Sequence, residues 1–170
     1  MQHYKYIILF AILFPPSINA LWETVTYTNI DTDVQTKVAR IENEDGYSLE
    51  IYRDASDAVR SRLNMNNINR LKEKNCPTYQ VDNRAVQNRS INDAPCLSHR
   101  QWAEFVLGYV TDNRITSSGL HDLINGNQIT YRFILENSGY SATSFSLGGS
   151  KQALVDALGN DLQVVTENTN

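Results

Sequence analysis

The sequence has few of the residue patterns on which catalytic and metal sites depend. Its 170 residues include only two cysteines and three histidines, and the cysteines do not form a C-x-x-C pair. No G-x-S-x-G segment marks a nucleophile elbow. His99 and His121 have no ligand partner nearby in the sequence. We therefore expect no metal site and no cofactor, and no residue is predicted to be catalytic.

Positive charge is also scarce, with 15 lysines and arginines against 19 acidic residues and a formal net charge of −4 at pH 7. Proteins that bind nucleic acid or anionic membranes concentrate basic residues instead. The composition therefore predicts that neither nucleic acid nor an anionic membrane is the partner.

The apolar run near the start of the chain is too short to span a membrane. Lys5 precedes the run from Ile7 to Phe14, and Pro15, Pro16 and the small residue Ala20 follow. This order is typical of a secretory signal peptide, so residues 1–20 are predicted to be removed before Leu21. A membrane anchor is the alternative, but the run has about half of the roughly 20 residues that a span requires. We expect a periplasmic or secreted protein without a transmembrane segment in the mature chain.

Both cysteines, Cys76 and Cys96, lie in the part that would be exported. Export to an oxidising compartment favours a disulfide between them. Closing a loop of about 20 residues would stabilise the fold by about 3 kcal/mol in the chain-entropy description.

The clearest fold signal lies between Gln128 and Gly159. Apolar and polar residues alternate over 128–135, and β-branched and aromatic residues return over 140–147, which predicts two antiparallel strands. Asn137, Ser138 and Gly139 supply the hairpin loop between them. A short helix is expected next, with Ser150 accepting a hydrogen bond at its start and Gly159 ending it.

Most other periodic segments also have period 2, the signature of strands. Strands are predicted at 21–28, 34–43, 47–53, 58–65 and 78–82, and a core strand or short helix at 101–110. The segment 58–65 also fits a helix, 68–74 is expected to form a helical turn, and Ser118 is expected to cap a helix over 119–125. Together these segments predict a mainly β fold: a single antiparallel, sandwich-like domain over 21–165 with one or two short helices, and a polar tail at 166–170.

A polar stretch from Asn83 to Pro95 lacks periodicity and is predicted to be a surface loop, with the disulfide at its base. Arg84, Arg89 and Arg100 give this region positive charge on an acidic chain. Arginines bind anionic groups in bidentate fashion, and Trp102 is the nearest aromatic anchor. These four residues are the predicted partner-binding site; the alternatives are a scattered, solvated set of arginines and a tryptophan in the core.

Three segments carry a resemblance: YQVD at 79–82 beside a cysteine, LINGNQITYRF at 123–133, and SFSLGGSKQAL at 144–154. Together they resemble exported bacterial proteins of the invasion-associated locus B type. The resemblance implies a periplasmic or secreted, non-enzymatic, sandwich-like protein associated with host contact or the envelope.

The leading functional hypothesis is thus a non-catalytic exported protein that binds an unknown protein or envelope component. The adjacent Ser98 and His99 do not make a nucleophile and base, because neighbouring side chains on a strand point to opposite faces. The alternative is a small secreted hydrolase whose site is assembled from distant residues such as Asp82, His99 and His121.

Overall fold

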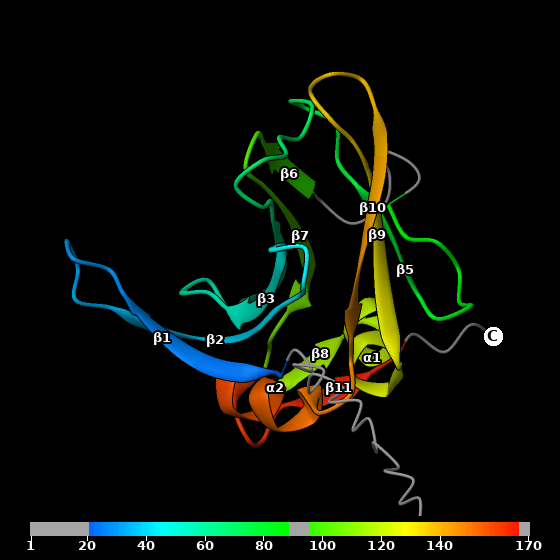
Figure 1. Ribbon diagram of the computed structural model, residues 1–170. Coiled ribbons are helices and arrows are strands. Elements are labelled where there is room, and N and C mark those ends of the chain that lie inside the picture. Colours follow the sequence, from blue (N-terminus) through cyan, green and yellow to red (C-terminus); the bar gives the residue numbers. More distant parts are fainter. Residues whose placement is uncertain (1–20, 89–95, 167–170) are drawn as a thin grey trace, which may run out of the picture.

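The largest element of the structure is a six-stranded antiparallel sheet with the strand order β1-β2-β3-β4-β7-β6 (Figure 1). The computed structural model describes residues 21–88 and 96–166. The strands of this sheet are β1 Glu23–Thr28, β2 Gln35–Glu42, β3 Ser48–Arg53, β4 Ala58–Asn64, β7 Trp102–Tyr109 and β6 Cys96–His99.

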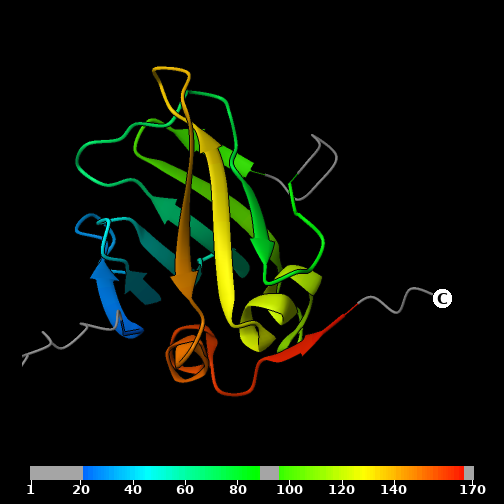
Figure 2. The ribbon, with the colours of Figure 1, turned by 45° about the vertical axis from the view of Figure 1, so that its right-hand side comes forward.

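A second antiparallel sheet, with the order β10-β9-β5, lies over one face of the first, as Figure 2 shows. Its strands are β5 Thr78–Val81, β9 Gln128–Ile134 and β10 Tyr140–Ser146. A short parallel pair, β8 Arg114–Thr116 and β11 Gln163–Val165, lies at one end beside the two helices. The structure confirms the predicted fold class, a mainly β single domain with two short helices.

Aromatic rings fill the space between the two sheets. The ring of Phe105 on β7 lies 5.2 Å from that of Tyr79 on β5 and 6.0 Å from that of Tyr131 on β9. Tyr131 is fully buried, and its hydroxyl shares a 3.0 Å hydrogen bond with the Ser61 hydroxyl on β4. Burial of aromatic side chains of this size contributes strongly to the core, and the hydroxyl pair leaves no buried polar group unsatisfied here.

The two helices, α1 Ser118–Asn125 and α2 Ser150–Leu158, lie at one end of the sheets (Figure 1). The predicted caps were one residue off. Ser117, not Ser118, caps α1, since its hydroxyl accepts from the Leu120 amide at 3.0 Å. At α2 the capping position is held by Gly149 in a left-handed conformation, and the Ser150 side chain is buried instead of capping. A left-handed backbone at this position favours glycine.

The segment 68–74 was predicted to be a helical turn, and that prediction is wrong. Leu71 forms an isolated β-bridge with Leu135, and the amide of Lys72 donates to the Ile134 carbonyl at 2.9 Å. Leu71 is fully buried, so its packing against the end of the β9–β10 hairpin overrides any local helix preference. The ambiguous segments 58–65 and 101–110 are both strands, β4 and β7.

A disulfide joins Cys76 to Cys96, as predicted. Cys76 precedes β5 in the three-stranded sheet, and Cys96 begins β6 at the edge of the six-stranded sheet. The covalent link therefore fixes the edge of one sheet against the other. A disulfide of this kind is typical of an oxidising, extracytoplasmic location.

Candidate functional site

The face of the six-stranded sheet turned away from the second sheet carries a layer of charged and aromatic side chains. Leu49, Ile51 and Phe105 point toward the three-stranded sheet and are fully buried. Because side chains alternate along a strand, Glu50 and Glu104 must point the other way. No described helix or strand covers this second face, which we call the outer face (Figures 1 and 2).

Opposite charges alternate across the outer face from strand to strand. The sheet register sets each residue of this row beside the next: Glu23, Arg40, Glu50, Arg62 and Glu104. The Arg40 guanidinium lies 3.4 Å from the Glu23 carboxylate and 3.8 Å from that of Glu50. Opposite charges that face each other across strands each stabilise a sheet by up to about 1 kcal/mol. The row therefore sets side chains of opposite charge beside one another across five neighbouring strands.

Glu104 is the best-held residue of this layer. Its side chain is only 7% exposed, although no sheet of the described residues lies over it. Its carboxylate accepts hydrogen bonds from the Tyr52 hydroxyl, from Arg60 at 2.9 Å and from Arg62 at 2.6 and 2.8 Å. Three donors of this kind satisfy a carboxylate that would otherwise be costly to bury.

The pKa values of Glu104 and Tyr52 agree with the geometry of their hydrogen bonds. Burial alone would raise the pKa of Glu104, but hydrogen bonds from Tyr52 and Arg62 outweigh it, and the nearby guanidinium charges lower the pKa further. The net result is a pKa below the ordinary value of a glutamate. Burial, and then the hydrogen bond to Glu104, raises the pKa of Tyr52 above its ordinary value, so Tyr52 stays a protonated donor.

Flat side chains stack beside this carboxylate. The Arg62 guanidinium carbon lies 5.5 Å from the ring centre of Tyr52 and 5.2 Å from that of Trp102. On its far side, the Trp102 ring stacks on His99 at 5.9 Å. Cation–π contacts of this kind are worth about 0.5–1 kcal/mol at exposed sites. Together they order a row of four flat groups from β3 to β6.

Asp54 supports the layer from the β3–β4 turn. Its carboxylate bonds to the Arg60 guanidinium and accepts from the Ser56 amide at 2.8 Å and the Ser56 hydroxyl at 2.7 Å. Burial raises the pKa of Asp54, but these hydrogen bonds more than offset it and hold the pKa at about 2. Arg60 is thereby held between Asp54 and Glu104.

The four predicted binding residues do not form one patch. Arg84 donates to the carbonyls of Asp122 and Asn125 at the end of α1, at 2.7 and 3.2 Å. Arg100 pairs with Glu136 at 2.8 Å beside the β9–β10 turn. Arg84 follows β5 near the start of β9, whereas Glu136, the partner of Arg100, follows the end of β9. Arg89 lies outside the described residues. Trp102 belongs to the outer face. Partner binding by the arginines stays a prediction.

The two histidines of the alternative hydrolase site are also far from each other. His99 ends β6, and His121 lies on α1 at the other end of the molecule (Figure 1). Asp82 accepts hydrogen bonds from the amides of Asn127 and Gln128, which fixes the chain where it enters β9. Among the residues described, no cluster of three or more histidine, cysteine or acidic side chains could hold a metal ion.

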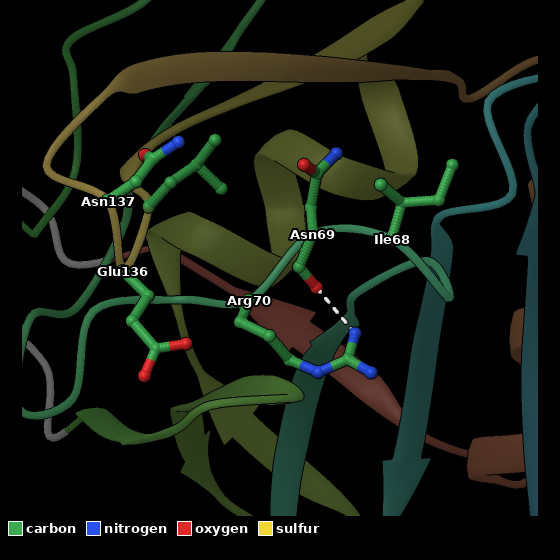
Figure 3. A pocket seen from close by; sticks show the side chains of 6 residues that line it. Ile68, Asn69, Arg70, Glu136 and Asn137 are labelled. Atoms are coloured by element: carbon green, nitrogen blue, oxygen red, sulfur yellow. Dashed lines mark hydrogen bonds between the residues drawn. The ribbon is translucent and has the colours of Figure 1, made fainter.

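A polar hollow of about 310 Å³ lies at the turn of the β9–β10 hairpin, between Ile68 to Arg70 and Leu135 to Asn137 (Figure 3). Its only arginine is held by the backbone that precedes it, because the Arg70 guanidinium donates to the carbonyls of Asn66 and Asn69 at 3.2 and 2.9 Å. The hollow therefore offers a ligand little uncommitted charge. An apolar hollow of about 210 Å³ lies between α2 and β11, lined by residues such as Ile124, Leu154 and Val164.

The sequence indicates Trp102 but not the layer of side chains around it. The alternation of Glu50 and Tyr52 with Leu49 and Ile51 is visible in the sequence, and it places the polar residues on a face of their own. Their neighbours on other strands depend on the register, which the sequence does not reveal. Charged residues two positions apart, such as Arg40 and Glu42 on β2 and Arg60 and Arg62 on β4, are the signal that could have indicated the outer face.

No protein family, no curated protein and no solved structure matches this chain. No helix in the described ranges has the length and apolar character needed to cross a membrane. The resemblance to exported proteins of the invasion-associated locus B type therefore stays a prediction.

Proposed function

We propose that this protein is an exported, non-catalytic binding protein whose outer face recognises a protein or an envelope component in the periplasm or outside the cell. The predicted signal peptide and the Cys76–Cys96 disulfide support the export. The resemblance to invasion-associated locus B type proteins supports a role in envelope function or host contact.

The observation that carries the proposal is the fixed layer of arginine, tyrosine and tryptophan around Glu104. Tryptophan, tyrosine and arginine are the residues that contribute most to binding energy in protein interfaces. Binding usually costs the entropy of ordering such side chains. Here Arg62 is already held by Glu104 and stacked between Tyr52 and Trp102, so much of that cost is removed.

The balance of charge on the outer face limits the kind of partner. Positive and negative side chains alternate along the row from Glu23 to Glu104, so the face presents no large potential of one sign. A partner would therefore be recognised by stacking on the flat groups and by hydrogen bonds. We expect an affinity that changes little with salt, unlike that of a charged patch.

The test is quantitative capture from an envelope or host-cell extract with wild type and Trp102→Ala as baits. Tyr140→Ala is the matched control, because it removes an aromatic side chain that is 87% exposed on β10, away from the outer face. We expect specific partners on wild type and Tyr140→Ala, and at least about tenfold less of them on Trp102→Ala, a loss of about 1.4 kcal/mol.

A fourth bait locates the site among the predicted residues. The variant with Arg84, Arg89 and Arg100 all changed to serine leaves the outer face intact and is expected to retain the partners. Partners that persist on Trp102→Ala but vanish from the three-arginine variant would overturn the outer face as the site. The absence of any specific partner on the wild-type bait would overturn the proposed function itself.

A further inference from the structure

The first strand, β1, is an exposed edge of the six-stranded sheet. Five of its six residues are exposed, and its register with β2 is continuous from Glu23 to Thr28. An edge strand presents unpaired backbone N–H and C=O groups, which another strand can bind. No described residue outside β2 bonds to the backbone of Thr24–Thr28.

The two edges of the three-stranded sheet are protected, in contrast to β1. On β10, the Ser144 carbonyl accepts from the Asn43 side chain at 3.1 Å, and the Ser146 carbonyl accepts from the Trp22 indole at 2.8 Å. On β5, Tyr79 exchanges two backbone hydrogen bonds with Gln87, at 2.8 and 3.3 Å. Natural proteins also protect edges with lysine, proline or a bulge, and β1 has none of these.

We propose that β1 pairs with β1 of a second copy of this chain, antiparallel and about a two-fold axis through Thr26. Two identical strands are self-complementary in this arrangement, because the backbone N–H groups of each lie opposite the C=O groups of the other. The only charged residue of β1 is Glu23 at its start, so no like charges face each other. The inference does not depend on the proposed function of the outer face.

The side chains of β1 favour the axis at Thr26. Val25 of one copy then faces Tyr27 of the other, and Thr24 faces Thr28. Pairs of a β-branched with an aromatic residue, and of threonine with threonine, are favourable across antiparallel strands. An axis at Val25 would instead place Glu23 opposite Tyr27.

Exposed apolar residues at the two ends of β1 agree with this pairing. Leu21 precedes the strand and is 79% exposed, and Ile30 in the turn after it is 97% exposed. In the two-fold arrangement, the turn after β1 in one copy lies beside the start of β1 in the other copy. The pairing therefore offers both residues cover that the single chain lacks. The expected removal of residues 1–20 leaves Leu21 as the first residue at this edge.

The outer faces of the two copies would lie on the same side of one continuous sheet. Val25 belongs to the outer face, as does Tyr27, whose hydroxyl donates to Glu50 at 3.0 Å. Each residue of β1 would pair with a residue an even number of positions away in the sequence, and such residues lie on the same face of a strand. Val25 and Tyr27 therefore stay on the outer face in both copies. The dimer would thus present two copies of the outer face side by side.

The test is the mass in solution of the exported chain, residues 21–170, by sedimentation equilibrium from about 1 µM to about 1 mM. We expect a concentration-dependent dimer. Thr26→Lys would place two lysines opposite each other on the axis, so it should weaken dimerisation at least about tenfold. Thr116→Lys, the same change at an exposed threonine of β8, is the control and should leave the dimer intact.

A cysteine cross-link tests the register. Thr26→Cys should form an interchain disulfide under mild oxidation, because residues on the axis face each other, whereas Thr24→Cys should not. Far-UV circular dichroism checks that each variant is folded. A monomer at every concentration, or a dimer that Thr26→Lys leaves unchanged, would overturn the proposal. Cross-linking of Thr24→Cys but not of Thr26→Cys would overturn the register.

Discussion

The two faces of the six-stranded sheet bury their side chains by different means. On the inner face, Leu49 and Phe105 are fully buried beneath a second sheet. On the outer face, Glu50 is 7% exposed and Glu104 is 6% exposed, with no described sheet over them. The residues that bury Glu104 are its own neighbours on β3 and β4, namely Tyr52, Arg60 and Arg62.

The side chains of the two faces are buried with different energetic consequences. Apolar burial on the inner face stabilises the fold in proportion to the area removed from water. Burial of charge on the outer face stabilises little by itself, because removing a carboxylate from water costs free energy that its partners must offset. A layer that is ordered yet contributes little net stability is suited to binding, which supports the proposal that a partner binds the outer face.

The largest effect is expected on the inner face. Phe105→Ala removes a fully buried ring that contacts Tyr79 and Tyr131 and should lower the free energy of unfolding by about 4 kcal/mol. Denaturant unfolding measures this loss. A loss below about 1 kcal/mol would show that the rings do not form the core.

The next largest effect is expected from Glu104→Ala. It leaves the Tyr52 hydroxyl and two arginines without their shared partner and should cost about 2 kcal/mol, less than a fully buried pair because the arginines are partly exposed. Glu104→Gln keeps the shape and part of the hydrogen bonding and should cost less. Equal losses for the two variants would contradict a role of the negative charge.

Lowering the pH should weaken the ion pairs of the outer face before it affects the apolar packing of the inner face. The folded-state pKa of Asp54 is about 2 against an ordinary value of 3.8, so its contribution is present above about pH 4 and is lost as the pH falls toward 2. Solvent screening reduces that contribution to about 1 kcal/mol. The free energy of unfolding, compared at pH 6 and at pH 2.5, measures this contribution. Asp54→Asn should reduce the difference in the free energy of unfolding between the two pH values. A difference as large as that of wild type would contradict the prediction.

The smallest effect is expected from Trp102→Ala. The indole is partly exposed and touches Arg62 and His99 without entering the core, so the free energy of unfolding should fall by less than about 1 kcal/mol. Thermal unfolding of this variant beside wild type is the measurement. A loss near that of Phe105→Ala would mean that Trp102 is a core residue, the alternative considered from the sequence.

The sequence predicts the strands well because alternation is a local property. The hairpin of β9 and β10 follows from the residues at 128–135 and 140–147 and the Asn-Ser-Gly turn between them. The two cysteines predict the disulfide because only one pairing is possible. The segment 68–74 was missed because its conformation depends on Leu71 packing against Leu135, which is distant in the sequence.

The candidate site could be predicted only in part, for a related reason. Trp102 stands out in the sequence as an aromatic residue near charged ones. Its actual neighbour Arg62 lies 40 positions away along the chain and reaches it through the pairing of β4 with β7. Arg84 looked uncommitted in the sequence, yet it caps α1 through carbonyls that only the folded chain brings near.

The central claim is that the side chains of the outer face are as fixed as those of the core, and the motion of the arginine side chains tests it most directly. Nitrogen-15 relaxation gives an order parameter for each guanidinium Nε. We predict values near 0.8 for Arg60 and Arg62, and below about 0.6 for Arg114, which is exposed on β8. Values for Arg60 and Arg62 as low as that of Arg114 would contradict the account, because the layer would then be an ordinary solvated surface.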